Sequence, residues 1–382
     1  MKPTVLIYKP SVGSSERKLL GLTLRDRLNR SCMRDGAAQV LPIDRAHEAM
    51  PGPIVILPST LVADQYALGA LLAERAECGV SMKAGAPIAR FDTRRAVSDD
   101  LVAAPEATLA ARSEDLELTG FAHVVTSRRE GTTAEKALLQ SLRKPVDGLI
   151  SRTINRPVSL FTTRWLARTG VTPNQWTIVT AILGVLGGLV MGQGGYLMLT
   201  LGAFLIHVSS VLDGCDGEIA RIKFKSSKIG EWLDTIADDI VNSSLILGLG
   251  FGIAATTGQN FYAGLSVVGV GLYLAYTSVV YHHLITRAQT GYALDFKWWF
   301  EEDNADANTM TGKLGSMDIL KLALRRDFFV FFFFVLTALT LPQVALWLSF
   351  IGAVATFTLA CTQTVMMRTR QSNSGTTRTA LK

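Results

Sequence analysis

Two pairs of aspartates in the second half of the sequence have the spacing of a cation site. Asp213 and Asp216 are three residues apart, and Asp234 and Asp238 are four apart. On α-helices, such spacings place each pair on one face. A helical hairpin that turns at residues 224–225 would bring the two pairs opposite each other, about 10 Å in from the turn.

Four facing carboxylates cannot all stay ionised in such a place unless cations balance them. Oxygen ligands without histidine or cysteine favour Mg²⁺, Mn²⁺ or Ca²⁺ over zinc. Because Mg²⁺ sites are commonly completed by substrate phosphates, the pattern predicts a phosphorylated substrate. Asp239 lies about 100° around the helix from Asp238, so we leave it out of the predicted ligand set.

Small residues surround these acids, and they have two interpretations. Gly214, Gly217, Ala220 and Gly230 could leave the helix surface bare beside the carboxylates for a ligand. They could also permit close packing of helices, which is the commonest use of small residues in membranes. Arg221 either clamps a diphosphate or neutralises the acids.

The acids must be positioned by membrane helices. Three runs without Asp, Glu, Lys or Arg, 169–212, 240–286 and 328–367, are 44, 47 and 40 residues long. One span needs about 20 apolar residues, so each run predicts two helices. With 48% hydrophobic and 18% charged residues, a purely soluble enzyme is excluded. The predicted spans are 175–193, 197–222, 228–251, 261–284, 327–342 and 344–367.

The basic residues indicate the orientation of these spans. Uncharged turns alternate with loops rich in Arg and Lys, and the positive-inside rule makes the basic loops cytoplasmic. We therefore expect a multi-pass protein of the cell membrane with the acids and both termini on the cytoplasmic side. The net charge of +6 then marks that face rather than nucleic-acid binding. Four scattered cysteines indicate neither a disulfide framework nor a zinc site.

Residues 1–140 predict a cytoplasmic α/β domain. Expected strands alternate with helices, which favours a mostly parallel sheet covered by helices. The strands are 5–8, 39–43 and 54–57, with further candidates at 86–91 and 121–126, and the helices are 14–31 and 61–77.

The remaining segments complete the predicted organisation. Residues 141–170 mix apolar side chains with Arg152, Arg156, Arg164 and Arg168 and are typical of a basic amphipathic helix on the membrane surface, the alternative being a solvated linker. Residues 171–370 hold the six spans, and 371–382 are expected to form a flexible tail.

The acids belong to a longer pattern, Asp213-x2-Asp216-Gly217-x2-Ala220-Arg221-x8-Gly230-x3-Asp234-x3-Asp238. It resembles the signature of the CDP-alcohol phosphotransferase family at every fixed position. Residues Thr172-Pro173-Asn174-x2-Thr177 at the start of the first span extend the resemblance. The chain as a whole then resembles a six-helix transmembrane bundle preceded by an α/β domain.

The resemblance implies a reaction and roles for these residues. Two divalent ions, Mg²⁺ or Mn²⁺, would be bound by Asp213, Asp216, Asp234 and Asp238. Asp238 would also act as general base on a hydroxyl that attacks the β-phosphorus of a CDP-alcohol and releases CMP. The CDP pocket would comprise Asn174, Thr177, Asp213, Gly217, Ala220, Arg221 and Gly230, although Asn174 and Thr177 could equally serve the start of a helix.

The acceptor site is less clear. Arginines at the cytoplasmic ends of later spans would suit an acceptor that carries a phosphate. The alternative is simple anchoring by the positive-inside rule. These arginines are Arg287, Arg325, Arg326 and Arg368.

The first domain resembles sugar-nucleotide nucleotidyltransferases in its opening residues. Gly13, Arg17 and Lys18 lie where those enzymes bind a triphosphate, but the glycine-rich loop is reduced. The strand at 54–57 is followed by Pro-Ser-Thr rather than by a metal-binding Asp. Proteins that fuse an inositol-1-phosphate cytidylyltransferase to a CDP-alcohol phosphotransferase have this layout. We expect a catalytically silent domain kept for structure, regulation or the contacts of a homodimer.

Three hypotheses follow for the whole chain. The first is a transferase in the lipid bilayer that joins a CDP-alcohol donor to a hydroxyl acceptor, making a phospholipid or an inositol-phosphate product. The second is a transporter, which would place acids near the midplane on several helices. The third is a non-catalytic membrane anchor for the first domain. The sequence leaves a lipid donor and a soluble inositol-type donor equally open.

Overall fold

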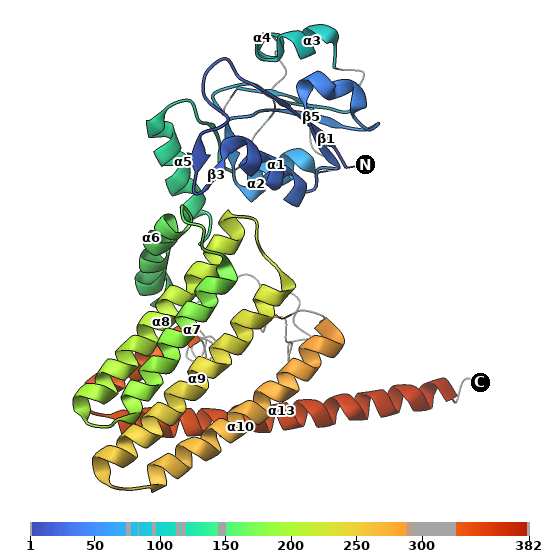
Figure 1. The fold of residues 1–382 in the computed structure, drawn as a ribbon. Helices are drawn as coiled ribbons and strands as arrows, with labels where there is room; N and C mark the ends of the chain where they lie inside the picture. Colours follow the sequence, from blue (N-terminus) through green and yellow to red (C-terminus); the bar gives the residue numbers. More distant parts are fainter. Residues whose placement is uncertain are drawn as a thin grey trace, which may run out of the picture. The chain divides into compact units, whose positions relative to one another are not determined.

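In a computed structural model of the chain, residues 2–73, 78–82, 84–93, 97–111, 116, 120–143, 150–288, 291 and 326–379 are described. The chain divides into two compact units (Figure 1). The first comprises Met1–Pro145 with Arg164–Gly170 and Arg221–Phe224. The second comprises Val146–Thr163, Val171–Ala220 and Lys225–Lys382.

The first unit is built on a five-stranded sheet in the order β4-β1-β5-β8-β7. The three strands predicted first are parallel, since β1 pairs with both β4 and β5. The other two are antiparallel to their neighbours, so the α/β class is confirmed while the parallel arrangement covers only part of the sheet. The bounds are β1 Thr4–Tyr8, β4 Gln39–Pro42, β5 Ile54–Pro58, β7 Gly79–Ser81 and β8 Ile88–Phe91.

Two helices of this unit begin later than predicted. Helix α1 spans Leu24–Arg34 and not 14–31, because Leu20 and Gly21 have positive φ and turn the chain into a short hairpin. Helix α2 spans Gln65–Leu72 and begins after the predicted start at residue 61, while residues 74–77 of the predicted helix lie outside the described residues. In each case a side chain at the N-cap fixes the start: Thr23 accepts from the Asp26 N–H and Asp64 from the Ala67 N–H,.

Short elements occupy the residues before these helices and the rest of the unit. The hairpin is β2 (Lys18–Leu19) with β3 (Leu22–Thr23), and β6 (Leu61–Ala63) pairs with β9 (Ala122–Val124) outside the main sheet. A 3₁₀ helix covers Ile43–Glu48. The remaining helices are α3 (Asp99–Ala103), α4 (Pro105–Ala110) and α5 (Arg128–Gln140).

The segment predicted as a basic surface helix contains a π-helical turn, Ser151–Asn155, and helix α6, Arg156–Leu166. Its arginines bind acids of the protein: Arg156 pairs with Glu218, and Arg164 and Arg168 pair with Glu135. The exposed side chains of α6 include Val158, Phe161 and Trp165. Arg152 and Arg168 are exposed as well, so the basic amphipathic segment on the membrane surface stays a prediction.

The second unit is helical, and within its described residues five helices are long and apolar enough to span a membrane. The chain is therefore a multi-pass membrane protein. The helices are α7 (Pro173–Gly192), α8 (Tyr196–Ile222), α9 (Lys228–Thr257), α10 (Phe261–His283), α12 (Arg326–Ala338) and α13 (Pro342–Thr379), with a π-helical turn at Leu284–Ala288.

Two of these helices differ from the predicted spans. Helix α12 begins at the predicted fifth span, 327–342, but ends at Ala338, and its 13 described residues are too few to be counted as a crossing. The six-span count therefore stays a prediction. Helix α13 continues to Thr379 through the segment predicted as a flexible tail, as no proline follows Pro342 to interrupt it,.

Candidate active site

The four aspartates of the predicted cation site come from two helices. Asp213 and Asp216 lie on α8, and Asp234 and Asp238 lie on α9. Carboxylate oxygens of Asp213, Asp216 and Asp234 all lie within 4.8 Å of one another. This donor set of hard oxygens fits a divalent cation such as Mg²⁺ or Mn²⁺. The hairpin geometry expected from the spacing thus brings the first three acids together.

The fourth acid is joined to the others by an arginine of α12. The Nη1 of Arg326 is 3.0 Å from Asp213 Oδ2 and also contacts Asp238 Oδ1. The side chains of Arg326 and Asp213 are less than one-fifth exposed, so the ion pair offsets charge where water is scarce. The sequence predicts an acceptor role for Arg326, whereas its guanidinium lies directly against Asp213 and Asp238.

The structure does not describe the side chains of the other three arginines of the predicted acceptor site. Arg325 lies outside the described residues, as do the side chains of Arg287 and Arg368. Arg221, assigned to the donor, lies in the last turn of α8, two turns beyond Asp213, and Ala220 precedes it.

Threonines of α7 orient the two acids of α8. The hydroxyl of Thr177 is 2.5 Å from Asp216 Oδ2, and the Thr180 hydroxyl is 3.4 Å from Asp213 Oδ1. The helix start is capped instead by Thr172, whose side chain accepts from the Gln175 N–H. The alternative that Thr177 only serves the start of the helix is therefore unnecessary, because that role belongs to Thr172 and Pro173.

The glycines fall into two classes. Some leave open space for a ligand, and others permit close packing of helices, which are the two interpretations that the sequence allows. A Cβ built on Gly214 or Gly217 would meet no described atom within 4 Å, so these glycines leave open space beside the acids. A Cβ on Gly230 would lie 3.0 Å from Asn174 Oδ1, which places Asn174 against the start of α9. By contrast, a Cβ on Gly188 would lie 2.0 Å from Ser244 Oγ, so Gly188 serves the packing of α7 against α9,.

This difference can be tested by enlarging one glycine of each class. We expect Gly217→Val to leave the melting temperature nearly unchanged and to raise the KM for a CDP-alcohol, because the added methyl groups occupy space meant for the ligand. We expect Gly188→Val to lower thermal stability by about 1–3 kcal/mol through overpacking. Melting curves in detergent and donor kinetics check both. A large fall in stability for Gly217→Val would show that its face is packed.

Two further acids near the site were not assigned a role by sequence analysis. Glu218 of α8 is fully buried and binds three partners: Arg156 Nη1 at 2.7 Å, Ser159 Oγ at 2.8 Å and Thr163 Oγ1 at 2.7 Å. It therefore ties α6 to the helix that carries Asp213 and Asp216. Because these partners precede Glu218 by more than 50 residues, no local sequence pattern predicts the contact.

The second acid is Asp239, which sequence analysis left out of the ligand set. Its carboxylate accepts hydrogen bonds from the hydroxyls of Tyr273 and Tyr281 on α10. Asn242 Nδ2 is 3.0 Å from the Tyr273 hydroxyl and extends the network. Asp239 thus joins α9 to α10, facing away from the acids of α8.

Residues 170–357 match the family model described as CDP-alcohol phosphatidyltransferase. This part of the chain is a CDP-alcohol phosphatidyltransferase domain. The family consists of transferases that form phosphodiester bonds, and it generally uses divalent metals. The three clustered aspartates of the domain could bind such a metal ion.

Curated relatives of the transferase domain cover a limited part of both chains. A bifunctional IPC transferase and DIPP synthase of Aquifex aeolicus is 39% identical over 117 residues, 30% of this chain and 26% of that protein. An archaetidylinositol phosphate synthase of Pyrococcus horikoshii is 36% identical over 88 residues, 23% of this chain and 45% of the relative. The chain thus matches about a quarter to a half of the length of these two relatives.

A solved structure is also similar to the chain. It is the phosphatidylinositol phosphate synthase of Mycobacterium tuberculosis with CDP-DAG bound, 18% identical with a TM-score of 0.38. The likeness covers 55% of this chain and 92% of that one.

Proposed function

We propose that the transferase domain moves a substituted phosphate from a CDP-alcohol to a hydroxyl acceptor and releases CMP. The observation that carries this proposal is the meeting of the acids of α8 and α9 beside the open surface of Gly214 and Gly217. In the step, the acceptor oxygen bonds to the β-phosphorus and the bond from that phosphorus to the CMP oxygen breaks. CMP leaves with the electron pair of that bond.

The roles of the acids follow from their positions. Asp213, Asp216 and Asp234 would hold two divalent ions, Mg²⁺ or Mn²⁺, and Asp238 would complete the set. When bound, such ions stabilise negative charge on the diphosphate and on the departing CMP. Asp238 takes the proton of the acceptor hydroxyl, since a carboxylate at the reacting centre can serve as general base. Thr177 keeps Asp216 oriented through its hydroxyl.

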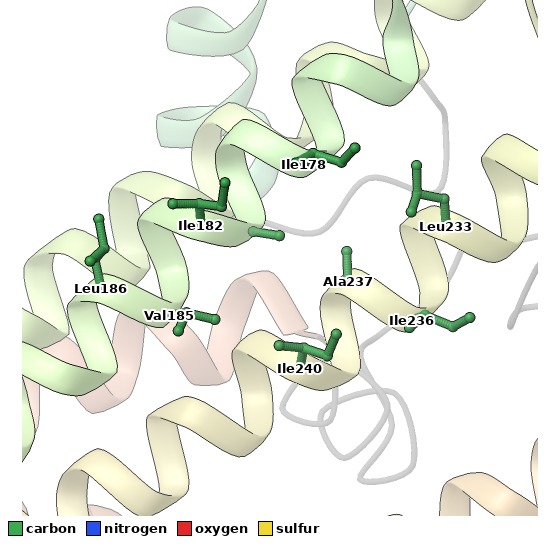
Figure 2. A pocket seen from close by; sticks show the side chains of 9 residues that line it. Ile178, Ile182, Val185, Leu186, Leu233, Ile236, Ala237 and Ile240 are labelled. Carbon is green, nitrogen blue, oxygen red and sulfur yellow. The ribbon is translucent and has the colours of Figure 1, made fainter.

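An apolar groove beside the acids favours a donor with a lipid tail. It lies between α7 and α9, has a volume of about 340 Å³, and is lined by apolar side chains alone (Figure 2). Leu233 and Ala237 of its wall directly precede Asp234 and Asp238, so the groove begins at the depth of the acids. A chain attached to a diphosphate at the acids could enter it, whereas an inositol would leave it unfilled. The wall consists of Ile178, Ala181, Ile182, Val185, Leu186, Leu233, Ile236, Ala237 and Ile240.

Arg326 supports an acceptor that carries a phosphate. Its guanidinium already lies among the acids, and its Nε has no hydrogen-bond partner among the described residues. A phosphate of the acceptor would supply a partner for this group. We propose the same role for Arg287, Arg325 and Arg368.

We propose that the active site and both termini lie on the cytoplasmic side of the cell membrane, with six spans and a homodimeric assembly. The basic loops support this orientation through the positive-inside rule. The exposed Phe161 and Trp165 of α6 suit a membrane–water interface, where aromatic side chains gather,.

We propose that the first unit performs no nucleotidyl transfer. A Cβ on Gly13 would lie 3.0 Å from Val125 O and 3.3 Å from Thr60 Cγ2, so the loop after β1 packs tightly at the end of β5. This place, between the carboxyl ends of parallel strands, is where such sheets bind nucleotides. β5 is followed by Ser59 and Thr60, without an acid for a metal.

The deciding experiment measures CMP release by the purified full chain with Mg²⁺ or Mn²⁺. CDP-diacylglycerol and CDP-inositol are given as separate donors, each with a panel of alcohols. We expect CMP from CDP-diacylglycerol, loss of the signal with a chelator, and recovery when metal is restored. Release from CDP-inositol alone would contradict the lipid donor. No release from either donor by folded protein would favour the anchor or transporter hypotheses.

A further inference from the structure

The turn of α8 that carries Asp213 and Asp216 has little packing beside these acids. A Cβ built on Gly214 or Gly217 would meet no described atom within 4 Å. A helix keeps its rotation about its own axis because side chains on its surface interlock with those of a neighbour. Bare glycines cannot interlock in this way, so the direction in which the two acids point must be set from another side of α8.

The opposite side of α8 carries Cys215 and Glu218. Each follows one of the two acids by two residues, which places it about 160° around the helix from that acid. Both side chains are fully buried. Cys215 packs against α6, with its Sγ 3.4 Å from Ser159 O. One face of α8 therefore presents the acids, and the other face is in contact with α6.

Three side chains of α6 hold the carboxylate of Glu218 in one direction. Arg156 and Ser159 donate to its Oε1, and Thr163 donates to its Oε2. These donors are three and four residues apart, so they lie on one face of α6. Because the two oxygens are bonded from different turns of α6, a rotation of α8 would break at least one bond. All four residues belong to the second unit.

Stability alone does not account for this contact. A buried ion pair offsets its desolvation cost only with excellent geometry, and apolar side chains of similar volume can often replace it without loss. Hydrogen bonds depend steeply on angle, whereas apolar contacts tolerate small rotations. The bonds of Glu218 to α6 thus specify an orientation that apolar packing would leave loose.

We propose that α6 is a positioning element for the cation site. Through Glu218 it fixes the rotation of α8, and with it the direction in which Asp213 and Asp216 point. This inference rests on the proposed function, in which these acids hold divalent ions. Because Mg²⁺ demands near-ideal geometry of its ligands, a small rotation of α8 lowers the affinity of the site for metal.

The test removes single hydrogen bonds to Glu218 while its ion pair stays in place. Thr163→Val and Ser159→Ala each delete one donor. Thr162→Val is the matched control, because it makes the same change at the neighbouring position, where the hydroxyl bonds to a carbonyl of its own helix. Mn²⁺ binding to the full chain in detergent is measured without donor, from the loss of the paramagnetic resonance signal of free Mn²⁺. Melting temperatures are measured in parallel.

We expect Thr163→Val to raise the Kd for Mn²⁺ about tenfold, the lower end of the range for residues that orient metal ligands. Ser159→Ala should have a smaller effect, because Arg156 donates to the same oxygen. The double variant should exceed either single variant, and Thr162→Val should leave the Kd unchanged. The Mn²⁺ concentration for half-maximal CMP release should rise in parallel with the Kd.

An unchanged Kd in folded Thr163→Val and in the double variant would overturn the proposal, even with a lower melting temperature, because α6 would then serve stability alone. An equal rise in Thr162→Val would also overturn it. If the double variant fails to fold, Thr163→Val decides. If the wild type binds Mn²⁺ but releases no CMP, the proposed function fails, while the binding measurement still decides whether α6 positions the acids.

Discussion

Replacing Asp238 with asparagine is expected to lower CMP release by about two to four orders of magnitude, the usual contribution of a general base. The amide has nearly the same shape as the carboxylate but cannot accept the acceptor's proton at neutral pH. The three clustered acids, Asp213, Asp216 and Asp234, remain in place. Binding of the CDP-alcohol should therefore be largely kept, and a fall in kcat should dominate the kinetics.

The neighbouring acid provides a matched control. Asp239→Asn changes the same chemical group one residue away, but this side chain faces the hydroxyls of Tyr273 and Tyr281. Its amide oxygen can still accept from a tyrosine, so we expect only a small loss of turnover. Donor binding at equilibrium and single-turnover CMP release are measured for both variants. Wild-type turnover in Asp238→Asn would show that Asp238 is not the general base.

The largest effect on stability is expected for Glu218. Its carboxylate is fully buried and paired with Arg156, whose side chain is only 11% exposed. Removing one partner of a buried ion pair leaves the other charge poorly compensated and costs about 3–5 kcal/mol. Glu218→Ala should lower the melting temperature markedly and loosen α6 from α8, with a secondary loss of activity through Asp216.

A double-mutant cycle separates the ion pair from simple loss of packing. Glu218→Leu and Arg156→Met are measured singly and together, because apolar side chains of similar volume can replace a buried ion pair with little loss. We expect the double variant to be more stable than the sum of the single effects predicts. Strict additivity in the melting data would mean that the two charges do not depend on each other.

Asp213, Asp216 and Asp234 lie close together, as the sequence predicts, because the acids repeat at helical spacing. Asp213 and Asp216, like Asp234 and Asp238, each share a helix face through local geometry that any helix imposes. A short hairpin then leaves few ways for the two helices to pair, so the depth of each acid follows from its distance to the turn. The contact of Arg326 with these acids could not be foreseen, as the chain between α10 and α12 has no periodic pattern that fixes its path.

The same contrast applies to the first unit. Buried runs such as 54–57 predict strands correctly because hydrophobic runs between turn residues depend on local sequence alone. The late start of α2 was missed because the pairing of Leu61–Ala63 with Ala122–Val124 joins segments distant in the chain. The late start of α1 was missed because a tight hairpin with positive φ at Leu20 and Gly21 leaves no trace in the hydrophobic periodicity.

The sequence by itself determined the membrane helices, the four aspartates and the family signature, because hydrophobic length and helical spacing are local properties. Only the tertiary structure decided which acids cluster and which join helices: Asp213, Asp216 and Asp234 lie together, Glu218 contacts α6, and Asp239 contacts α10. It also decided that Gly217 is open and Gly188 is packed. Residues of the same type have different roles here, because their burial and contacts depend on neighbouring helices. The sequence does not predict which helices lie side by side.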